Sequence, residues 1–236
     1  MAAKTICGCV RHRTEPLEKA DSRLRKCRKA GRKEEETGLK KFSKLDLIRT
    51  LEQELNYKRF VHTMAVAGTA SSLAMCYGAD LQKAEIAGLL HDCAKCIDVR
   101  KMQRICEKVG LPVSEFEAGS GSLLHSKAGS VLAAEKYGYT DPDIVNAIRY
   151  HTTGRPGMSL LEKIIFVADY IEPGRFSAKN LPEIRKMAFE DIDGALRKIL
   201  YDTLVYLNST GNPVDPMTQK TYDYYNRMYA EKNIYD

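Results

Sequence analysis

The stretch Ala87–Lys95, AGLLHDCAK, places a histidine and an aspartate side by side at the end of an apolar run. It belongs to a segment rich in Ala and Leu that follows Asp80, a residue type that caps helix starts, so the sequence predicts a helix over Leu81–Ile97. Burying a carboxylate and an imidazole in such a helix costs several kcal/mol unless the two are paired or bind a cation. His91 and Asp92 therefore predict a metal site.

A second acid stands in a similar setting. Asp169 follows five apolar residues, Ile164–Ala168, and is expected to need a cation for the same reason. Three further histidines, His62, His125 and His151, also lie beside predicted helix ends or acidic partners. A single histidine is more often a hydrogen-bonded core or surface residue than a ligand, but this set together points to metal chemistry.

The pattern from Phe42 onward is helical nearly throughout. Ser43 is expected to cap the first helix and Gly78 to end the second, and no stretch alternates with the period of a strand. The sequence predicts an all-α protein with helices over 45–55, Tyr57–Tyr77, Leu81–Ile97, Val99–Val109, Leu123–Tyr137, Asp143–Tyr150, Ser159–Ile171, Leu181–Leu207 and Met217–Lys232.

The positive charge of the 236-residue chain lies at its beginning. Residues 1–44 hold 14 Lys or Arg and 6 Asp or Glu, whereas the remaining residues hold 23 and 25. Residues 1–42 show no sustained hydrophobic period and predict a disordered or loosely helical basic extension, followed by one catalytic domain over 43–236. Such an extension can contact RNA weakly through counterion release, but a dispensable extension is the favoured interpretation.

Composition excludes several classes of protein. No apolar run approaches the roughly 20 residues that span a bilayer, and residues 1–10 lack the apolar core of a signal peptide, so a cytoplasmic protein without membrane contact is expected. The seven cysteines are an odd number and suit a reducing compartment without disulfides. Cys93 and Cys96 have redox spacing, but no strand precedes them, and both are interpreted as packing residues.

The ordered histidines and aspartates resemble the HD superfamily of metal-dependent phosphohydrolases. Within that superfamily the sequence most specifically resembles the YqeK-type family, bacterial HD-domain enzymes that split diadenosine tetraphosphate symmetrically into two ADP. It runs from about Lys44 to about Tyr229 and rests on these segments: Arg59–His62, Leu89–Lys95, Leu124–His125, Ala147–Gly154 and Ala168–Arg175. The resemblance implies an HD-domain helical bundle and a symmetrical bis(5'-nucleosyl)-tetraphosphatase.

The resemblance also implies a ligand set for two metal ions. One ion would be held by four residues and the second site completed by two, with Asp92 bridging: His62, His91, Asp92 and Asp169, then His125 and His151. Nitrogen and carboxylate ligands suit iron, which the family favours, or manganese or another such ion. Two close cations can activate a water molecule, so no nucleophilic side chain is required.

Cationic side chains are expected to bind the polyphosphate. Lys95 lies four residues after His91 and Arg59 three before His62, which places each on the ligand's face of a helix. Arg175 follows the Pro-Gly break after Asp169. The predicted catalytic residues are Asp92, Lys95 and Arg59.

The loop after His151 offers weaker candidates. Arg155 could contact phosphate, but solvation of a helix end explains it equally well. Gly154 could allow close approach of a nucleotide, but a turn explains it equally well. Thr152 could offer a hydroxyl to the substrate.

Glu172 lies elsewhere, after Asp169, and is either a partner of a metal ligand or an exposed turn acid.

Two other functions stay open. One is another HD phosphohydrolase acting on a nucleoside triphosphate, a guanosine alarmone or a cyclic nucleotide. The other is an RNA- or ribosome-associated protein with a structural metal. The cationic residues beside the ligands argue against this function, because a structural metal site needs no phosphate-binding cations. A small-molecule nucleotide is the expected partner, and a homodimer is an open alternative to a monomer.

Overall fold

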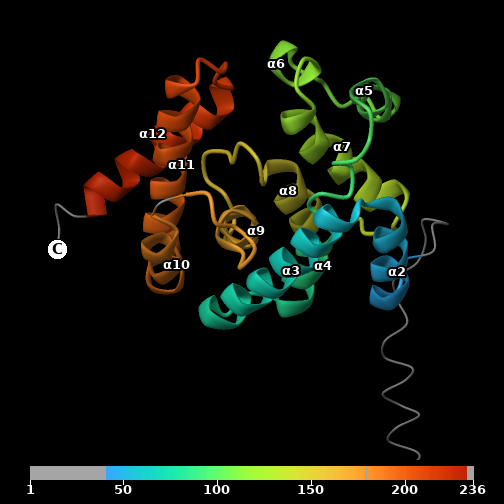
Figure 1. Ribbon diagram of the computed structural model, residues 1–236, viewed down its shortest axis with the longest axis horizontal. Helices are drawn as coiled ribbons and strands as arrows, with labels where there is room; N and C mark the ends of the chain where they lie inside the picture. The colour runs from blue at the N-terminus through green and yellow to red at the C-terminus, as the bar shows by residue number, and fades with distance from the viewer. Residues whose placement is uncertain (1–40, 179, 233–236) are drawn as a thin grey trace, which may run out of the picture. The chain divides into compact units, whose positions relative to one another are not determined.

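The computed structural model describes residues 41–178 and 180–232, in which it contains eleven helices and no strand (Figure 1). The all-α prediction is therefore confirmed for this part of the chain. The basic extension lies outside it, except for its last two residues. The helices are α2 (Lys44–Glu54), α3 (Tyr57–Tyr77), α4 (Leu81–Leu90), α5 (Val99–Lys108), α6 (Glu115–Ala118), α7 (Gly121–Glu135), α8 (Pro142–Tyr150), α9 (Leu160–Ile171), α10 (Leu181–Glu190), α11 (Ile192–Ser209) and α12 (Pro216–Lys232).

Side-chain caps start the helices where the sequence predicts them. The Ser43 hydroxyl accepts a hydrogen bond from the Asp46 amide at the start of α2, and the Asp80 carboxylate accepts one from the Lys83 amide at the start of α4. Gly78 ends α3 with a φ of 68°, a left-handed conformation that glycine adopts without a steric penalty. These three boundaries are confirmed.

The predicted end of the third helix at Ile97 is wrong. Helix α4 ends at Leu90, and the chain continues in tight turns whose amides bond three residues back, Cys93 to the Leu90 carbonyl and Lys95 to the Asp92 carbonyl. The apolar pattern continues because these turns are also buried, so composition alone does not distinguish them from helix. The His-Asp pair therefore lies just after a helix and not within it.

The predicted helix over Leu181–Leu207 is two helices. Asp191 adopts an extended conformation, with φ of −147° and ψ of 93°, and its carboxylate accepts a hydrogen bond from the Gly194 amide at the start of α11. This capping contact competes with a continuous helix, and Asp is a residue type that favours it.

A short helix, α6, was not predicted. It begins with a capping box in which Ser114 and Glu117 exchange side-chain and backbone hydrogen bonds. Helix α7 then begins at Gly121, two residues before the predicted start.

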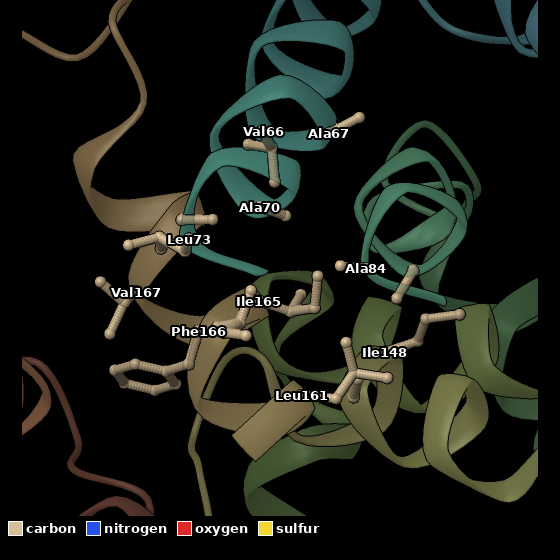
Figure 2. Close-up of a cluster of buried hydrophobic side chains, with 14 of the residues drawn as sticks. Val66, Ala67, Ala70, Leu73, Ala84, Ile148, Leu161, Ile165, Phe166 and Val167 are labelled. Carbon is tan, nitrogen blue, oxygen red and sulfur yellow. The ribbon is translucent and has the colours of Figure 1, made fainter. Parts of the chain in front are cut away.

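The main hydrophobic core is formed by α3, α4, α8 and α9 together with residues of α2, α10 and α11, and a smaller buried cluster lies between α5 and α7. Figure 2 shows Leu73 of α3 near Val167 of α9, with Val66 and Ala70 on the preceding turns of α3, all of them fully buried. Helices α3 and α4 lie side by side (Figure 1) and approach closely where Gly88 faces the backbone of Ala67. A Cβ at position 88 would lie 2.7 Å from the Ala67 Cα atom. This close contact fixes the end of α4 relative to α3.

None of the helices in the described residues is long and apolar enough to cross a bilayer.

Candidate metal centre

The six residues predicted as metal ligands come from five separate parts of the fold and meet at one place. His62 lies on α3, His91 and Asp92 follow α4, and His125 lies on α7. His151 caps the end of α8, and Asp169 lies in the last turn of α9. They form three overlapping groups whose ligand atoms lie within 4.8 Å of one another: His62, His91 and Asp92; His91, His151 and Asp169; Asp92, His125 and His151.

Backbone carbonyls orient two of the histidines. The Nδ1 atoms of His91 and His151 lie 2.7 Å from the carbonyl oxygens of Gly88 and Ile148, three residues earlier in each case. A carbonyl only accepts, so each Nδ1 carries the proton and donates. The Nε2 atoms of both rings are then free to act as ligands.

The rings of His62 and His125 are oriented in the same way, with Nδ1 toward an acceptor. His62 Nδ1 lies 3.1 Å from Glu172 Oε1, and His125 Nδ1 lies 3.2 Å from the Gly121 carbonyl. Glu172 is buried, with 3% of its surface exposed, so it is a partner of His62 and not an exposed turn acid. All four imidazoles therefore turn an Nε2 atom inward, an arrangement that suits a bound cation and otherwise sets lone pairs against each other.

Asp92 offers its two carboxylate oxygens to different histidines. Oδ1 lies 2.9 Å from His125 Nε2 and 3.8 Å from His151 Nε2, whereas Oδ2 lies 3.7 Å from His62 Nε2 and 3.5 Å from His91 Nε2. Oδ1 is buried, and no side chain or backbone group in the described residues forms a hydrogen bond of good geometry with it. A buried carboxylate oxygen without such a bond fits a cation.

Asp169 completes the His62 end of the cluster. Its Oδ1 atom lies 3.0 Å from His62 Nε2, 4.0 Å from His91 Nε2 and 2.8 Å from Nη2 of Arg175. The side chain keeps 22% of its surface exposed, more than any of the other five. The cluster is therefore open to solvent on this side.

The charge states suit metal ligation. Burial alone would raise the pKa of Asp92, but the neighbouring His91 and His125 side chains hold it well below its usual range. Burial lowers the pKa of His151 to about 3 and also lowers the pKa of His125. The carboxylates of Asp92 and Asp169 act in the opposite direction on His91, whose pKa is raised despite its burial. An ionised carboxylate beside a neutral imidazole, as for Asp92 and His151, is the form that binds a transition metal.

Thiolates do not contribute to this set. Burial raises the pKa of the Cys93 thiol to about 12, and its Sγ atom lies 3.7 Å from the Gly129 carbonyl. Cys96 is exposed, so the packing interpretation holds for Cys93 and is wrong for Cys96. The four cysteines in the described part of the chain are free thiols.

Two cations approach Asp92. Nη1 of Arg59 donates to Asp92 Oδ2, and Nζ of Lys95 lies 3.9 Å from Asp92 Oδ1 and 3.2 Å from His125 Nε2. The spacing argument for Lys95 assumes a continuous helix and is therefore wrong, but the turn after α4 brings its ammonium to the cluster. Burial lowers the pKa of Lys95 despite the nearby carboxylate.

The loop after His151 is held by its own contacts. The Arg155 guanidinium is bonded to the buried Glu162, with N–O distances of 3.0 and 3.1 Å, and lies over the Tyr150 ring. This pairing favours the structural interpretation of Arg155.

Thr152 and Gly154 differ in their surroundings. The Thr152 Oγ1 atom is buried and has no hydrogen-bond partner among the described residues. Gly154 has a φ of 64°, and a Cβ there would lie 2.7 Å from the Thr221 methyl group, so turn geometry and packing explain this glycine.

A pocket of about 500 Å³ adjoins the His62 end of the cluster. We call it the aromatic pocket; it is formed by the first turns of α3 and the chain after α9, including Tyr57, Arg59, His62, Arg175 and Phe176. A second pocket, of about 560 Å³, lies between residues of the α6–α7 region and residues around the α11–α12 connection. Neither Tyr57 nor Phe176 stands out in the sequence as a candidate site residue, because a lone aromatic residue in a turn or at a helix start gives no periodic signal.

Comparison with known proteins identifies the family of this chain. The model of the HD domain family matches residues 59–174, which span every residue of the cluster. The chain is 41% identical to "Bis(5'-nucleosyl)-tetraphosphatase, symmetrical" of Bacillus subtilis over 76% of this chain and 95% of that protein. It is 38% identical to the protein of the same name in Staphylococcus aureus, over 80% and 96% of the two chains.

A solved structure has the same fold. It is described as the crystal structure of a predicted HD superfamily hydrolase involved in NAD metabolism from Clostridium acetobutylicum. The TM-score is 0.78 and the identity 40%, and the similarity covers 80% of this chain and all of that one. The fold of the described helices is therefore the HD fold.

Proposed function

This chain belongs to the HD-domain family together with its symmetrical bis(5'-nucleosyl)-tetraphosphatase relatives, and on that premise we propose that it hydrolyses diadenosine tetraphosphate and related dinucleoside polyphosphates into two nucleoside diphosphates. The observation that carries the proposal is the convergence of six ligand side chains beside three cations. A purely structural metal needs no cationic groups beside it, whereas a polyphosphate does.

We propose that the cluster holds two transition metal ions. Asp92 would bridge them, with His62, His91 and Asp169 on one side and His125 and His151 on the other. Support comes from the division of the Asp92 oxygens between these two sets of histidines. A nitrogen and carboxylate set suits iron, which we propose as the native metal. When bound, the pair would supply an activated water molecule and neutralise charge on the scissile phosphate.

The chain's own residues would bind and orient the substrate. Arg59, Lys95 and Arg175 each lie against a carboxylate or imidazole of the cluster, so their charges stand where the polyphosphate must enter. Arg175 and Arg59 line the aromatic pocket, and Lys95 reaches the His125 end. Glu172 holds the proton on His62 Nδ1 and so keeps Nε2 turned inward.

Product analysis in oxygen-labelled water tests the reaction. Metal-loaded protein given diadenosine tetraphosphate should yield two ADP, with label in only one of them, because water attacks one inner phosphorus and the other half departs. AMP with ATP among the products would rule out symmetric cleavage. Turnover of a nucleoside triphosphate or cyclic nucleotide without turnover of the dinucleotide would show that the chain is another HD phosphohydrolase.

Lys95→Ala tests the role of the cations. Removing one preorganised charge from a developing anion commonly costs about 2.7 to 4 kcal/mol at the transition state, so kcat should fall roughly a hundredfold to a thousandfold. The bound metal should stay, since the variant keeps all six proposed ligands. Lys186→Ala, whose side chain is 77% exposed on α10, is the control and should match the wild type. Equal turnover in both variants would contradict the role given to Lys95.

A further inference from the structure

The aromatic pocket contains the two most exposed large hydrophobic side chains that the structure describes. Phe176 is 84% exposed and Tyr57 83%, and the next such residue, Met75, is 67% exposed. Covering such a ring with a ligand would remove apolar surface from water, which is favourable. The two rings come from separate elements, the start of α3 and the chain after α9, yet they line the same pocket.

The pocket is continuous with the candidate metal centre. His62 lines the pocket and its Nε2 atom lies 3.0 Å from Asp169 Oδ1, so the wall of the pocket is itself part of the cluster. Arg59 and Arg175 also line it, and each contacts an aspartate of the cluster. A ligand in the pocket thus meets aromatic rings at one part of the wall and guanidinium groups next to the metal ligands.

The arrangement of aromatic rings followed by guanidinium groups next to the metal ligands matches half of a dinucleoside polyphosphate, with its base followed by its phosphates. The scissile phosphate must lie at the metal centre, and a symmetric substrate extends from there in two directions, with a base at each end. A volume of about 500 Å³ is in the range of small-molecule sites. Aromatic side chains stack on any base, because every base has a π face.

Resting on the proposed function, we infer that the aromatic pocket binds one nucleoside diphosphate half of the substrate. Its base stacks on Phe176 and Tyr57, and its phosphates contact Arg59 and Arg175. Stacking does not distinguish hydrogen-bonding patterns, so this half of the substrate can carry adenine or guanine. These rings bind the substrate and do not take part in bond cleavage.

Steady-state kinetics of Phe176→Ala and Tyr57→Ala with diadenosine tetraphosphate test this site. Stacking losses of the usual size correspond to a rise in KM of about fivefold to a hundredfold for each ring. The kcat should change less than twofold, because stacking stabilises ground state and transition state alike. Phe189→Ala and Tyr206→Ala are matched controls, since these rings are 43% and 62% exposed and lie outside the pocket. Both controls should leave KM unchanged.

Two further measurements separate base stacking from a structural role. Inhibition by inorganic tetraphosphate, which has no base, should be the same in the wild type and in both pocket variants. Phe176→Trp should keep a KM near the wild-type value, because the larger ring still stacks. If Phe176→Ala loses metal, the KM values of Tyr57→Ala and Phe176→Trp decide the matter.

The outcomes distinguish this inference from the proposed function. A KM within twofold of the wild type in both alanine variants, while the wild type still cleaves the dinucleotide, would overturn the inference that the aromatic pocket binds the base. The proposed function would remain. A wild type that does not cleave the dinucleotide would overturn both.

Discussion

Asp92 is the residue on which the two proposed metal sites depend, because each of its oxygens faces a different pair of histidines. Asp92→Ala removes a ligand from both sites at once. Elemental analysis should find close to two transition metals per chain in the wild type and almost none in this variant. Asp223→Ala, at an exposed position on α12, is the matched control and should retain its metal.

A different result would change the interpretation of the cluster. Retention of one ion by Asp92→Ala would show that the carboxylate does not bridge. A wild-type preparation that is active without metal would contradict the metal centre altogether.

Glu172 acts on the cluster through His62. Glu172→Gln keeps an oxygen that can accept from His62 Nδ1 but removes the negative charge that makes the imidazole a better ligand. Changes at such supporting partners commonly lower metal affinity 10- to 100-fold. Titration with a competing chelator measures this loss, and Glu190→Gln, 62% exposed on α10, is the control. Equal affinity in the two variants would mean that Glu172 only shapes the turn before Gly174.

At the scale of elements, the contact between α3 and α4 positions the His-Asp pair. Gly88→Ala would place a Cβ 2.7 Å from the Ala67 Cα atom, and a backbone atom cannot move aside as a flexible side chain can. We expect a loss of about 1 to 3 kcal/mol in the free energy of unfolding, measured by denaturant titration. Metal affinity should fall as well, because the Gly88 carbonyl orients His91.

Gly68→Ala is the matched control for this contact. Gly68 lies within α3, and a Cβ there would have no atom within 4 Å. Alanine is a better helix former than glycine by about 0.8 to 1.0 kcal/mol, so this variant should be as stable as the wild type or more stable. A Gly88→Ala variant as stable as Gly68→Ala would show that the helices can separate without cost.

At the scale of the whole molecule, the charge of residues 1–44 is separable from the proposed catalytic residues, all of which lie between Arg59 and Arg175. Deletion of residues 1–40 should leave turnover of small nucleotides nearly unchanged. Any RNA binding should weaken, and its dependence on salt should become less steep, because fewer phosphate charges are neutralised. Filter binding at several salt concentrations measures this change. A large loss of turnover would place the boundary of the catalytic domain earlier in the chain.

Much of the candidate site could be predicted from the sequence, because buried charge is costly wherever it occurs. His91, Asp92 and Asp169 stand out as polar residues in apolar segments, and the structure brings all three together. The caps at Ser43 and Asp80 are local hydrogen bonds and could be predicted for the same reason that they form. The all-α class follows from a hydrophobic period that persists through most of the chain.

Where local signals compete, the sequence alone did not predict where a helix ends. The turns after Leu90 and the helix break at Asp191 depend on which hydrogen bonds tertiary packing favours, and a buried apolar turn has the composition of a buried helix.

Sequence by itself determined the helical class and singled out His91, Asp92 and Asp169, because both follow from the cost of exposing apolar groups or burying charged ones. The full set of six proposed ligands came from the resemblance to the HD superfamily. Only the tertiary structure decided which partner each polar group has. It turned four Nε2 atoms inward, paired Arg155 with Glu162, assigned Glu172 to His62 and brought Tyr57 and Phe176 to one pocket. These contacts join residues far apart in the chain, and their geometry depends on how the helices pack.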